Sequence, residues 1–140
     1  MTNLEIHNIC KIYNIKNYTI NSDGSIDVDG NVVISNKFLS KIPIKFNKVS
    51  GYFNCSYNYL TTLENCPNEI GKNFSCYSNR ITSLEGFPQK VGEYTHCYLN
   101  FYLESINGYT GDYKKLLLSD NKKYLIRKHK LNLINNIIKQ

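Results

Sequence analysis

Apolar and polar positions recur along the middle of the chain with a constant period of 21 residues. Residues 52–72 read YFNCSYNYLTTLENCPNEIGK, and residues 73–93 read NFSCYSNRITSLEGFPQKVGE. The matched positions, written as pairs one period apart, are Phe53 and Phe74, Cys55 and Cys76, Asn58 and Asn79, Leu60 and Ile81, Thr61 and Thr82, Leu63 and Leu84, Glu64 and Glu85, Pro67 and Pro88, Ile70 and Val91, and Gly71 and Gly92. A fixed period near 20 residues predicts a solenoid, in which each repeat forms one coil.

The same period continues on both sides of this pair with weaker matches. The positions that still match are Val32, Ile34, Leu39, Ile42 and Val49 one period upstream, and Cys97, Asn100 and Tyr102 one period downstream. We therefore expect about four coils over residues 31–106. Irregular end coils are expected, because a terminal coil must face water or a cap.

Residues 1–30 are predicted to cap the N-terminal end of the solenoid. A helix is expected over residues 2–14, because Thr2 and Glu5 have the spacing of a capping box. Its expected apolar face consists of Leu4, Ile9, Ile12 and Tyr13. Two β-forming stretches, around Tyr18 and around Ile26, flank the turn residues 22–24 and predict a hairpin.

Residues 113–140 are predicted to form a basic C-terminal helix. It is expected to begin near Asn121 with Ser119 or Asp120 as its N-cap. An apolar stripe is expected to dock on the last coil, and its members are Tyr124, Leu125, Leu131, Ile134, Ile137 and Ile138. The 140 residues therefore predict one domain of the α+β class.

The repeat also carries a family resemblance. Residues 71–81, GKNFSCYSNRI, fit the pattern L-x-x-L-x-L-x-x-N-x-L except at the first position. The chain resembles short-repeat leucine-rich-repeat proteins of the phage and bacterial type, whose coils read roughly N-x-L-T-S-L-E-G-x-P-x-x-V-G-G-x-F-x-C. This resemblance implies a leucine-rich-repeat-like solenoid with short parallel strands, and it implies little about function.

Two positions of the repeat, one occupied by asparagine and one by cysteine, have predicted roles inside the coils. Asn58, Asn79 and Asn100 are expected to stack as a ladder whose amides satisfy backbone groups left unpaired by a tight bend. Cys55, Cys76 and Cys97 are expected to stack on the inner side of neighbouring strands. A disulfide or a metal site is conceivable there, but inert packing is favoured, because no His or carboxylate shares the inward register. Five cysteines, an odd number, favour reduced thiols in a cytoplasmic setting.

The positions that alternate with the inward ones predict an exposed, concave sheet surface. These positions are Asn31, Val33, Ser35, Tyr52, Asn54, Ser56, Asn73, Ser75, Tyr77, Tyr94, His96 and Tyr98. The candidate partner-binding residues among them are Tyr52, Asn54, Asn73, Tyr77, Tyr94, His96 and Tyr98. Tyrosines with small polar neighbours are typical of adaptable binding surfaces. The alternative is that Tyr and Asn are simply abundant throughout this chain.

Positive charge is concentrated at the C-terminal end. Residues 113–140 contain seven Lys and one Arg against one Asp, a net charge of +7, whereas the whole chain carries +6. The candidate nucleic-acid-binding residues are Lys122, Lys123, Arg127, Lys128 and Lys130. One alternative is a solvated cap. A membrane-surface helix is disfavoured, because the apolar stripe is expected to cover the end of the solenoid.

No motif in the sequence indicates catalysis. There is no carboxylate pair, no Gly-rich phosphate loop and no zinc spacing, so no catalytic residue, metal or cofactor is predicted. His96 and Cys97 are adjacent, but neighbouring strand residues point to opposite faces, which disfavours a nucleophilic pair.

The sequence thus favours a non-enzymatic binding protein. The resemblance and the charge suggest a phage-derived inhibitor in the host cytoplasm, which docks on a protein partner such as a defence ribonucleoprotein, in the manner of an anti-CRISPR protein, with RNA contact and no membrane. The alternative is a generic protein-interaction module, or a self-assembling module such as a dimer, without nucleic-acid contact.

Overall fold

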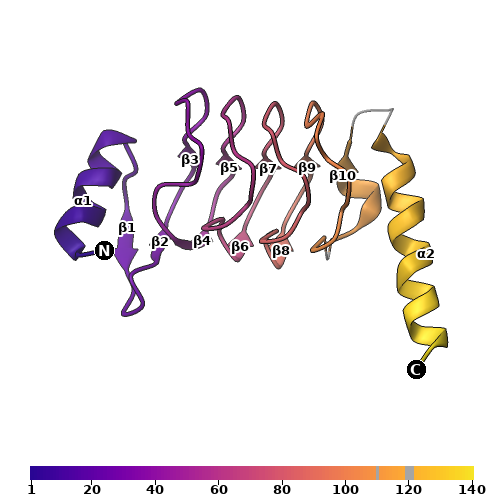
Figure 1. Ribbon diagram of the computed structural model, residues 1–140. Coiled ribbons are helices and arrows are strands. Elements are labelled where there is room, and N and C mark those ends of the chain that lie inside the picture. The colour runs from indigo at the N-terminus through magenta and orange to yellow at the C-terminus, as the bar shows by residue number, and fades with distance from the viewer. Residues whose placement is uncertain (110, 119–121) are drawn as a thin grey trace.

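The computed structural model describes residues 1–109, 111–118 and 122–140. It shows a β-solenoid of about four turns with parallel strands and a helix at each end. The coils stand side by side in a nearly straight row, with the N-terminal helix at one end and the C-terminal helix at the other (Figure 1).

Each coil contributes a short strand to two separate sheets, which form two walls of the solenoid. Wall A has the strand order β1-β2-β4-β6-β8, and wall B has the order β10-β9-β7-β5-β3. The strands of wall A are β1 Tyr18–Ile20, β2 Ile26–Val28, β4 Phe46–Val49, β6 Glu69–Ile70 and β8 Lys90–Val91. The strands of wall B are β3 Val32–Val33, β5 Phe53–Asn54, β7 Phe74–Ser75, β9 Thr95–His96 and β10 Leu116–Leu117. Wall A is an addition to the sequence analysis, which expected strands on one wall of the coils.

The pairing register confirms the 21-residue period. Phe53 pairs in parallel with Phe74, and Phe74 pairs with Thr95, each one period further along the chain. The register continues past the predicted end of the coils at residue 106, because β10 pairs in parallel with β9, with Leu116 beside Thr95. The short 3-10 turn Tyr113–Lys115 leads directly into β10 and so lies within the coils rather than after them.

The N-terminal cap confirms the predicted helix and hairpin. Helix α1 spans Asn3–Ile12, and Thr2 and Glu5 form the expected capping box. Strands β1 and β2 pair antiparallel, and β2 then pairs in parallel with β4, which joins the hairpin to the coils. The predicted face of α1 was wrong in part. Leu4 and Ile12 are about 70% exposed, whereas Ile6 and Cys10, one turn apart, are fully buried.

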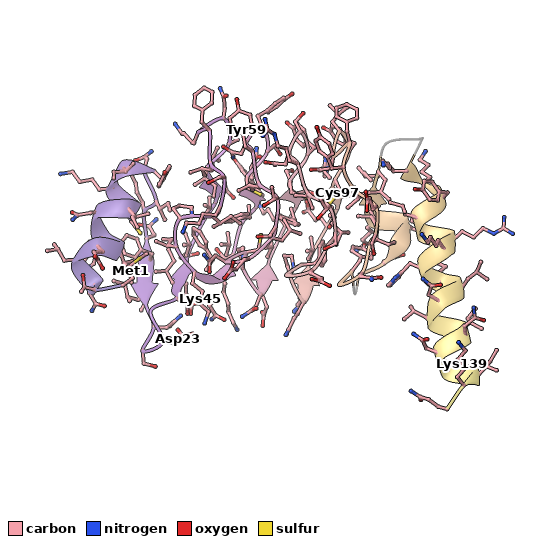
Figure 2. All side chains as sticks on the ribbon, viewed as in Figure 1. Met1, Asp23, Lys45, Tyr59, Cys97 and Lys139 are labelled. Carbon is pink, nitrogen blue, oxygen red and sulfur yellow. The ribbon has the colours of Figure 1, made fainter. Side chains whose placement is uncertain are left out.

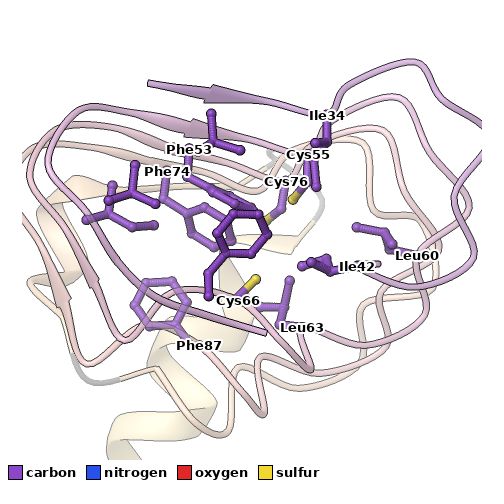
Figure 3. Packing of buried hydrophobic residues seen from close by; sticks show 14 of the residues in the cluster. Ile34, Ile42, Phe53, Cys55, Leu60, Leu63, Cys66, Phe74, Cys76 and Phe87 are labelled. Carbon is purple, nitrogen blue, oxygen red and sulfur yellow. The ribbon is translucent and has the colours of Figure 1, made fainter. Parts of the chain in front are cut away.

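The interior is a single apolar core lined by both walls (Figure 3). Phe53 and Phe74 are fully buried, with ring centroids 6.2 Å apart, and Phe46 from wall A packs edge-on against Phe53 at 5.0 Å. Ile81 and Leu60 fill the bend side of the same core. Because such aromatic and aliphatic burial contributes about 1.5–3 kcal/mol per side chain, this continuous column is the main source of stability.

The asparagine ladder forms as predicted. Asn79 is buried, its amide nitrogen donates to the Cys55 and Cys76 carbonyl oxygens, and its side-chain oxygen accepts from the Leu60 backbone N–H. Asn58 and Asn100 repeat this pattern in the neighbouring coils. Each asparagine therefore joins its own coil to the preceding one through backbone groups that no strand partner satisfies.

Glycine is required where the backbones of stacked coils approach closely. The Gly92 N–H donates to the Ile70 carbonyl oxygen at 2.9 Å, and a Cβ atom at residue 92 would overlap the Gly71 carbonyl oxygen. A Cβ atom at residue 71 would likewise overlap the Ser50 carbonyl oxygen. The repeated glycine thus allows the coils to stack at backbone hydrogen-bonding distance.

The C-terminal helix is present, and its predicted docking stripe was wrong except at Leu125. Helix α2 spans Tyr124–Ile138, and Leu125 is its one buried residue, with Ile126 partly buried against the core. The other members of the stripe are 50–75% exposed: Tyr124, Leu131, Ile134, Ile137 and Ile138. The reason is geometric, because the second half of α2 continues beyond the coils and has no surface to cover (Figure 1). The predicted N-cap residues Ser119 and Asp120 lie outside the described residues.

Candidate macromolecule-binding surface

Wall B brings all seven predicted partner-binding residues onto one side of the solenoid. Asn54 and His96 lie on β5 and β9, while Tyr52 and Tyr94 precede these strands and Tyr98 follows β9. Tyr94 is 51% exposed and Tyr52 is 37% exposed. Ser56, which was expected on the same surface, is instead fully buried. The wall therefore offers aromatic rings to solvent, with small polar groups between them.

Three asparagines of this wall also have a structural role. The side-chain oxygen of Asn73 accepts a hydrogen bond from the Tyr94 backbone N–H at 2.9 Å, and Asn31 does the same for Tyr52 at 3.0 Å. The Asn54 side chain accepts from the Ser56 backbone N–H. These contacts hold the backbone that presents the tyrosines, so Asn73 and Asn54 act as positioning residues for the neighbouring rings.

Three tyrosines at the edge of wall B form a column across neighbouring coils. The Tyr77 and Tyr98 rings stack with centroids 4.5 Å apart and an interplanar angle of 13°, and Tyr57 packs edge-on against Tyr77 at 5.0 Å. His96 lies 6.2 Å from Tyr98. Burial, with Tyr98 and Tyr57 nearby, raises the pKa of Tyr77. The Tyr77 phenol is therefore neutral near pH 7, and the three packed rings form a continuous aromatic column.

Another aromatic row lies along the bend of the coils and shares Tyr57 with this column. The sequence analysis missed this row and placed Tyr102 at the inward position of Ile81, whereas Tyr102 is exposed and Leu103 is buried instead. We call this row the aromatic bend, and it comprises Phe38, Tyr57, Tyr59, Phe101 and Tyr102. These rings are 45–75% exposed. The guanidinium of Arg80 lies 4.6 Å from the centre of the Tyr59 ring. The labelled Tyr59 projects from this bend, on the opposite side of the coils from Asp23 (Figure 2).

The backbone explains why the side chains of the aromatic bend are exposed. Each bend contains a residue with a left-handed conformation, with φ of 54° at Asn36, 55° at Tyr57, 53° at Ser78 and 56° at Leu99, and the first bend has a second one at Phe38, with φ of 57°. Such φ values are uncommon for residues other than Gly and Asn and cost free energy. The signal was present in the sequence, since Phe38, Tyr59 and Phe101 share one position of the 21-residue frame with Arg80.

The basic helix meets wall B at a groove between β10 and α2. The groove has a volume of about 630 Å³ and is lined by Lys114, Leu116, Leu117, Lys123, Ile126, Arg127, Lys130 and Leu131. Because Leu117 pairs with His96, the groove directly adjoins the tyrosine-rich part of wall B. Three of the five predicted nucleic-acid-binding residues, Lys123, Arg127 and Lys130, line this groove.

The other two predicted cations lie elsewhere. Lys128 lines a smaller hollow of about 240 Å³ on another side of α2, together with Glu104 and His129. Lys122 precedes α2 and is partly buried. The structure thus divides the predicted basic patch, and we refer to the part formed by Lys114, Lys123, Arg127 and Lys130 as the basic groove.

The cysteine column lies inside the core, away from this surface. Cys76 and Cys97 are buried with their sulfur atoms 3.0 Å apart, and their contact and burial raise the pKa of the Cys76 thiol. Burial likewise raises the pKa of Cys66. Cys97 points into the core while His96 lies on the outer side of β9, so these two residues do not form a nucleophilic pair. Among the described residues, no cluster of His, Cys, Asp or Glu could hold a metal ion.

Searches of family models, curated proteins and solved structures found no match to this chain. Within the part of the chain that the structure describes, no helix combines the length and the apolar character required to span a bilayer.

Proposed function

We propose that this protein is a non-enzymatic binding protein that docks on a host macromolecule through wall B, the aromatic bend and the basic groove. The observation that carries the proposal is the continuity of these three surfaces. The stacked tyrosines, the rings of the aromatic bend and the cations of the basic groove adjoin one another. This supports a binding role, because tyrosine and arginine are among the residues that most often dominate the binding energy at protein interfaces. The repeat resemblance adds a solenoid architecture, which commonly binds through its sheet surface.

The partner that fits this surface best is a ribonucleoprotein. The uncharged tyrosines of wall B suit a protein surface, where rigid rings provide contact area at low entropic cost. The cations of the basic groove suit phosphate groups, since each phosphate contact releases counterions and strengthens binding. A defence ribonucleoprotein inhibited in the anti-CRISPR manner is the specific hypothesis, and it rests on the phage-type repeat together with this pairing of surfaces. Host cytoplasm is the corresponding location.

The test uses guide-loaded CRISPR effector complexes and measures inhibition of target cleavage and the affinity of the complex. The Tyr94→Ala/Tyr98→Ala variant should weaken binding by at least about 30-fold, because a tyrosine hot spot contributes about 2 kcal/mol. The Arg127→Glu/Lys130→Glu variant should weaken binding and reduce its salt dependence. The matched control is Lys48→Ser on wall A, which should bind normally.

Three results would contradict the proposal or its parts. Equal inhibition by the wall B double variant would exclude wall B as the docking surface. Binding that is insensitive to nuclease treatment, to salt and to charge reversal in the basic groove would remove the nucleic-acid contact. Absence of binding to all effector complexes, followed by capture from bacterial host lysate of a partner that contains no RNA, would remove the ribonucleoprotein hypothesis.

A generic interaction or self-assembly role is the second candidate. It is favoured by the exposed rings of the aromatic bend, which could contact any protein surface. Sedimentation at several protein concentrations tests the self-assembly role, because a monomer at all concentrations would exclude it. The generic interaction role would be favoured over the first candidate by capture of a protein partner that contains no RNA.

A further inference from the structure

The second half of α2 exposes an apolar surface that the proposed function does not use. We call this surface the distal face, and it consists of Leu131, Leu133, Ile134, Ile137 and Ile138. Their exposed fractions run from 46% for Leu133 to 75% for Ile138. Residues three, four and seven apart lie on one side of a helix. The five side chains therefore form one continuous strip, although clusters of this kind are normally covered in soluble proteins.

The position of the distal face makes it accessible. All residues from 130 to 140 are exposed, and Figure 1 shows this half of α2 extending past the last coil. Lys139 lies at its far end, in the direction that points away from the coils (Figure 2). Leu131, at the start of this strip, also lines the basic groove, and the four residues that follow it in the strip are exposed to solvent.

The charges around the distal face indicate that its partner is negatively charged. Residues 121–140 contain six cations and no Asp or Glu; the cations are Lys122, Lys123, Arg127, Lys128, Lys130 and Lys139. Arg127 and Lys130 lie four residues before Leu131 and Ile134, so they continue the strip by one turn. Long cationic side chains at the edge of an apolar strip can place their charges at a polar boundary while their stems remain in apolar surroundings.

A second copy of the chain fits these charges poorly. Two distal faces packed against each other would bring two cationic helices together, with no carboxylate from residues 121–140 of either copy to compensate. A partner for this helix has to cover the aliphatic strip and also supply negative charge to the cations. An anionic lipid surface does both, because its acyl chains cover the strip and its headgroups neutralise the cations. The reason for disfavouring a membrane-surface helix from the sequence was that the stripe should cover the solenoid end, and the structure removes that reason.

We propose that the distal face of α2 inserts into the surface of membranes that contain anionic lipids and thereby tethers the protein there. The membrane proposal shares Arg127, Lys130 and Leu131 with the basic groove, whereas Ile134, Ile137 and Ile138 lie outside it. It goes beyond the proposed function, and substitutions at these three isoleucines test it without changing a residue of the groove.

The test exploits the absence of tryptophan from the natural sequence. The full-length Ile137→Trp variant is mixed with vesicles of phosphatidylglycerol and phosphatidylcholine, and the tryptophan emission maximum is recorded. We expect a shift to shorter wavelength with these vesicles and little change with phosphatidylcholine alone. The matched control is Tyr52→Trp, whose probe lies on wall B, far from α2, and should not respond.

Vesicle sedimentation provides the second measurement. In the Ile134→Ser/Ile138→Ser variant, the ratio of vesicle-bound to free protein should fall at least about tenfold. Each aliphatic side chain that is buried in the membrane favours the bound state. Its circular dichroism should match that of the natural chain, because both positions are exposed. High salt should also weaken binding.

Each contrary result overturns the proposal. Vesicle binding that the Ile134→Ser/Ile138→Ser variant retains in full would show attraction by charge without insertion. Equal binding to vesicles with and without phosphatidylglycerol would exclude recognition of anionic lipid. Failure to bind vesicles, with a dimer in sedimentation that the same variant converts to monomer, would assign the distal face to a second copy.

Discussion

The two walls of the solenoid share one interior but present opposite surfaces to solvent. On wall A, the outward row reads Asp27, Lys48, Glu69 and Lys90, and these residues pair in register, so the charge alternates in sign from coil to coil. Lys48 and Glu69 form an ion pair at 3.4 Å. On wall B, the equivalent outward row reads Val33, Asn54, Ser75, His96 and Leu117.

This difference indicates which wall is available for a partner. The alternating charges of wall A find their counterions within the wall, and opposite charges on neighbouring strands stabilise a sheet. The outward row of wall B has no alternating charges that pair with one another. Exposed aromatic rings lie along the margins of this wall, and their burial against a partner would be favourable. The contrast therefore supports the proposal that wall B, rather than wall A, is the surface that binds a partner.

The largest expected effect tests whether both walls depend equally on the common core. Phe74→Ala on wall B should lower the free energy of unfolding by about 3–5 kcal/mol, and Ile70→Ala on wall A by about 2–5 kcal/mol, because both side chains are buried. Tyr94→Ala, at an exposed ring of wall B, should change it by less than about 0.5 kcal/mol. Urea unfolding followed by circular dichroism gives all three values. A cost at Tyr94 similar to that at Phe74 would show that the outer rings of wall B are structural.

The next effect concerns the bend that connects the two walls. Asn79→Ala should cost about 2–3 kcal/mol, because the Leu60 N–H loses its acceptor and two carbonyls each lose a donor. The matched control is Asn135→Ala, at an exposed position of α2, which should be neutral within about 0.5 kcal/mol. Equal effects at the two asparagines in urea unfolding would refute the ladder as a source of stability.

A smaller effect should distinguish the outer surfaces directly. Lys48→Glu places a third carboxylate between Asp27 and Glu69 and should cost about 1 kcal/mol at low salt, since like charges on neighbouring strands repel. Ser75→Glu on wall B has Asn54 and His96 as neighbours and should cost less. Added salt should reduce the penalty at residue 48. A penalty that salt does not change would show that the alternation on wall A is not electrostatic.

The smallest effect is a pH dependence at the edge of wall A. The Lys45 ammonium, with hydrogen bonds from Ser25, holds the pKa of the Asp23 carboxyl well below its usual range. A lowered pKa in the folded state stabilises the protein above the ordinary carboxyl value of 3.8, and this stabilisation is lost as pH falls below that value. The contribution should be small and salt-sensitive, because both side chains are more than half exposed. Asp23→Asn should abolish this part of the acid destabilisation, and an unchanged acid profile would contradict it.

The sequence predicted wall B well because its repeat is carried by large, regular positions. Phe53 with Phe74, the three ladder asparagines and the inward cysteines all hold the same frame, so their register could be read directly. Wall A was harder to detect, because charged residues of alternating sign, such as Lys48 and Glu69, do not resemble a repeat. The hydrophobic pattern nevertheless placed Val49, Ile70 and Val91 in the frame.

The end helices show a different limit. Periodicity identifies an apolar face on a helix, but it cannot show what covers that face. In α1 the residues that bury themselves are Ile6 and Cys10, and in α2 Leu125 docks while Ile134 and Ile138 remain in solvent. The aromatic bend was missed because one of its four equivalent positions holds Arg80, which interrupts the aromatic pattern. Its exposure follows from the left-handed backbone at the bend, which composition does not reveal.

The most direct test of the account is hydroxyl-radical footprinting of the protein bound to its partner complex, compared with the unbound protein. We predict protection of Tyr94, Tyr98 and Phe101, which lie on wall B and the aromatic bend, and unchanged reactivity at Tyr18 on wall A. Protection confined to Tyr18 and its neighbours on wall A, with wall B as reactive as in the unbound protein, would contradict the assignment of wall B as the binding surface.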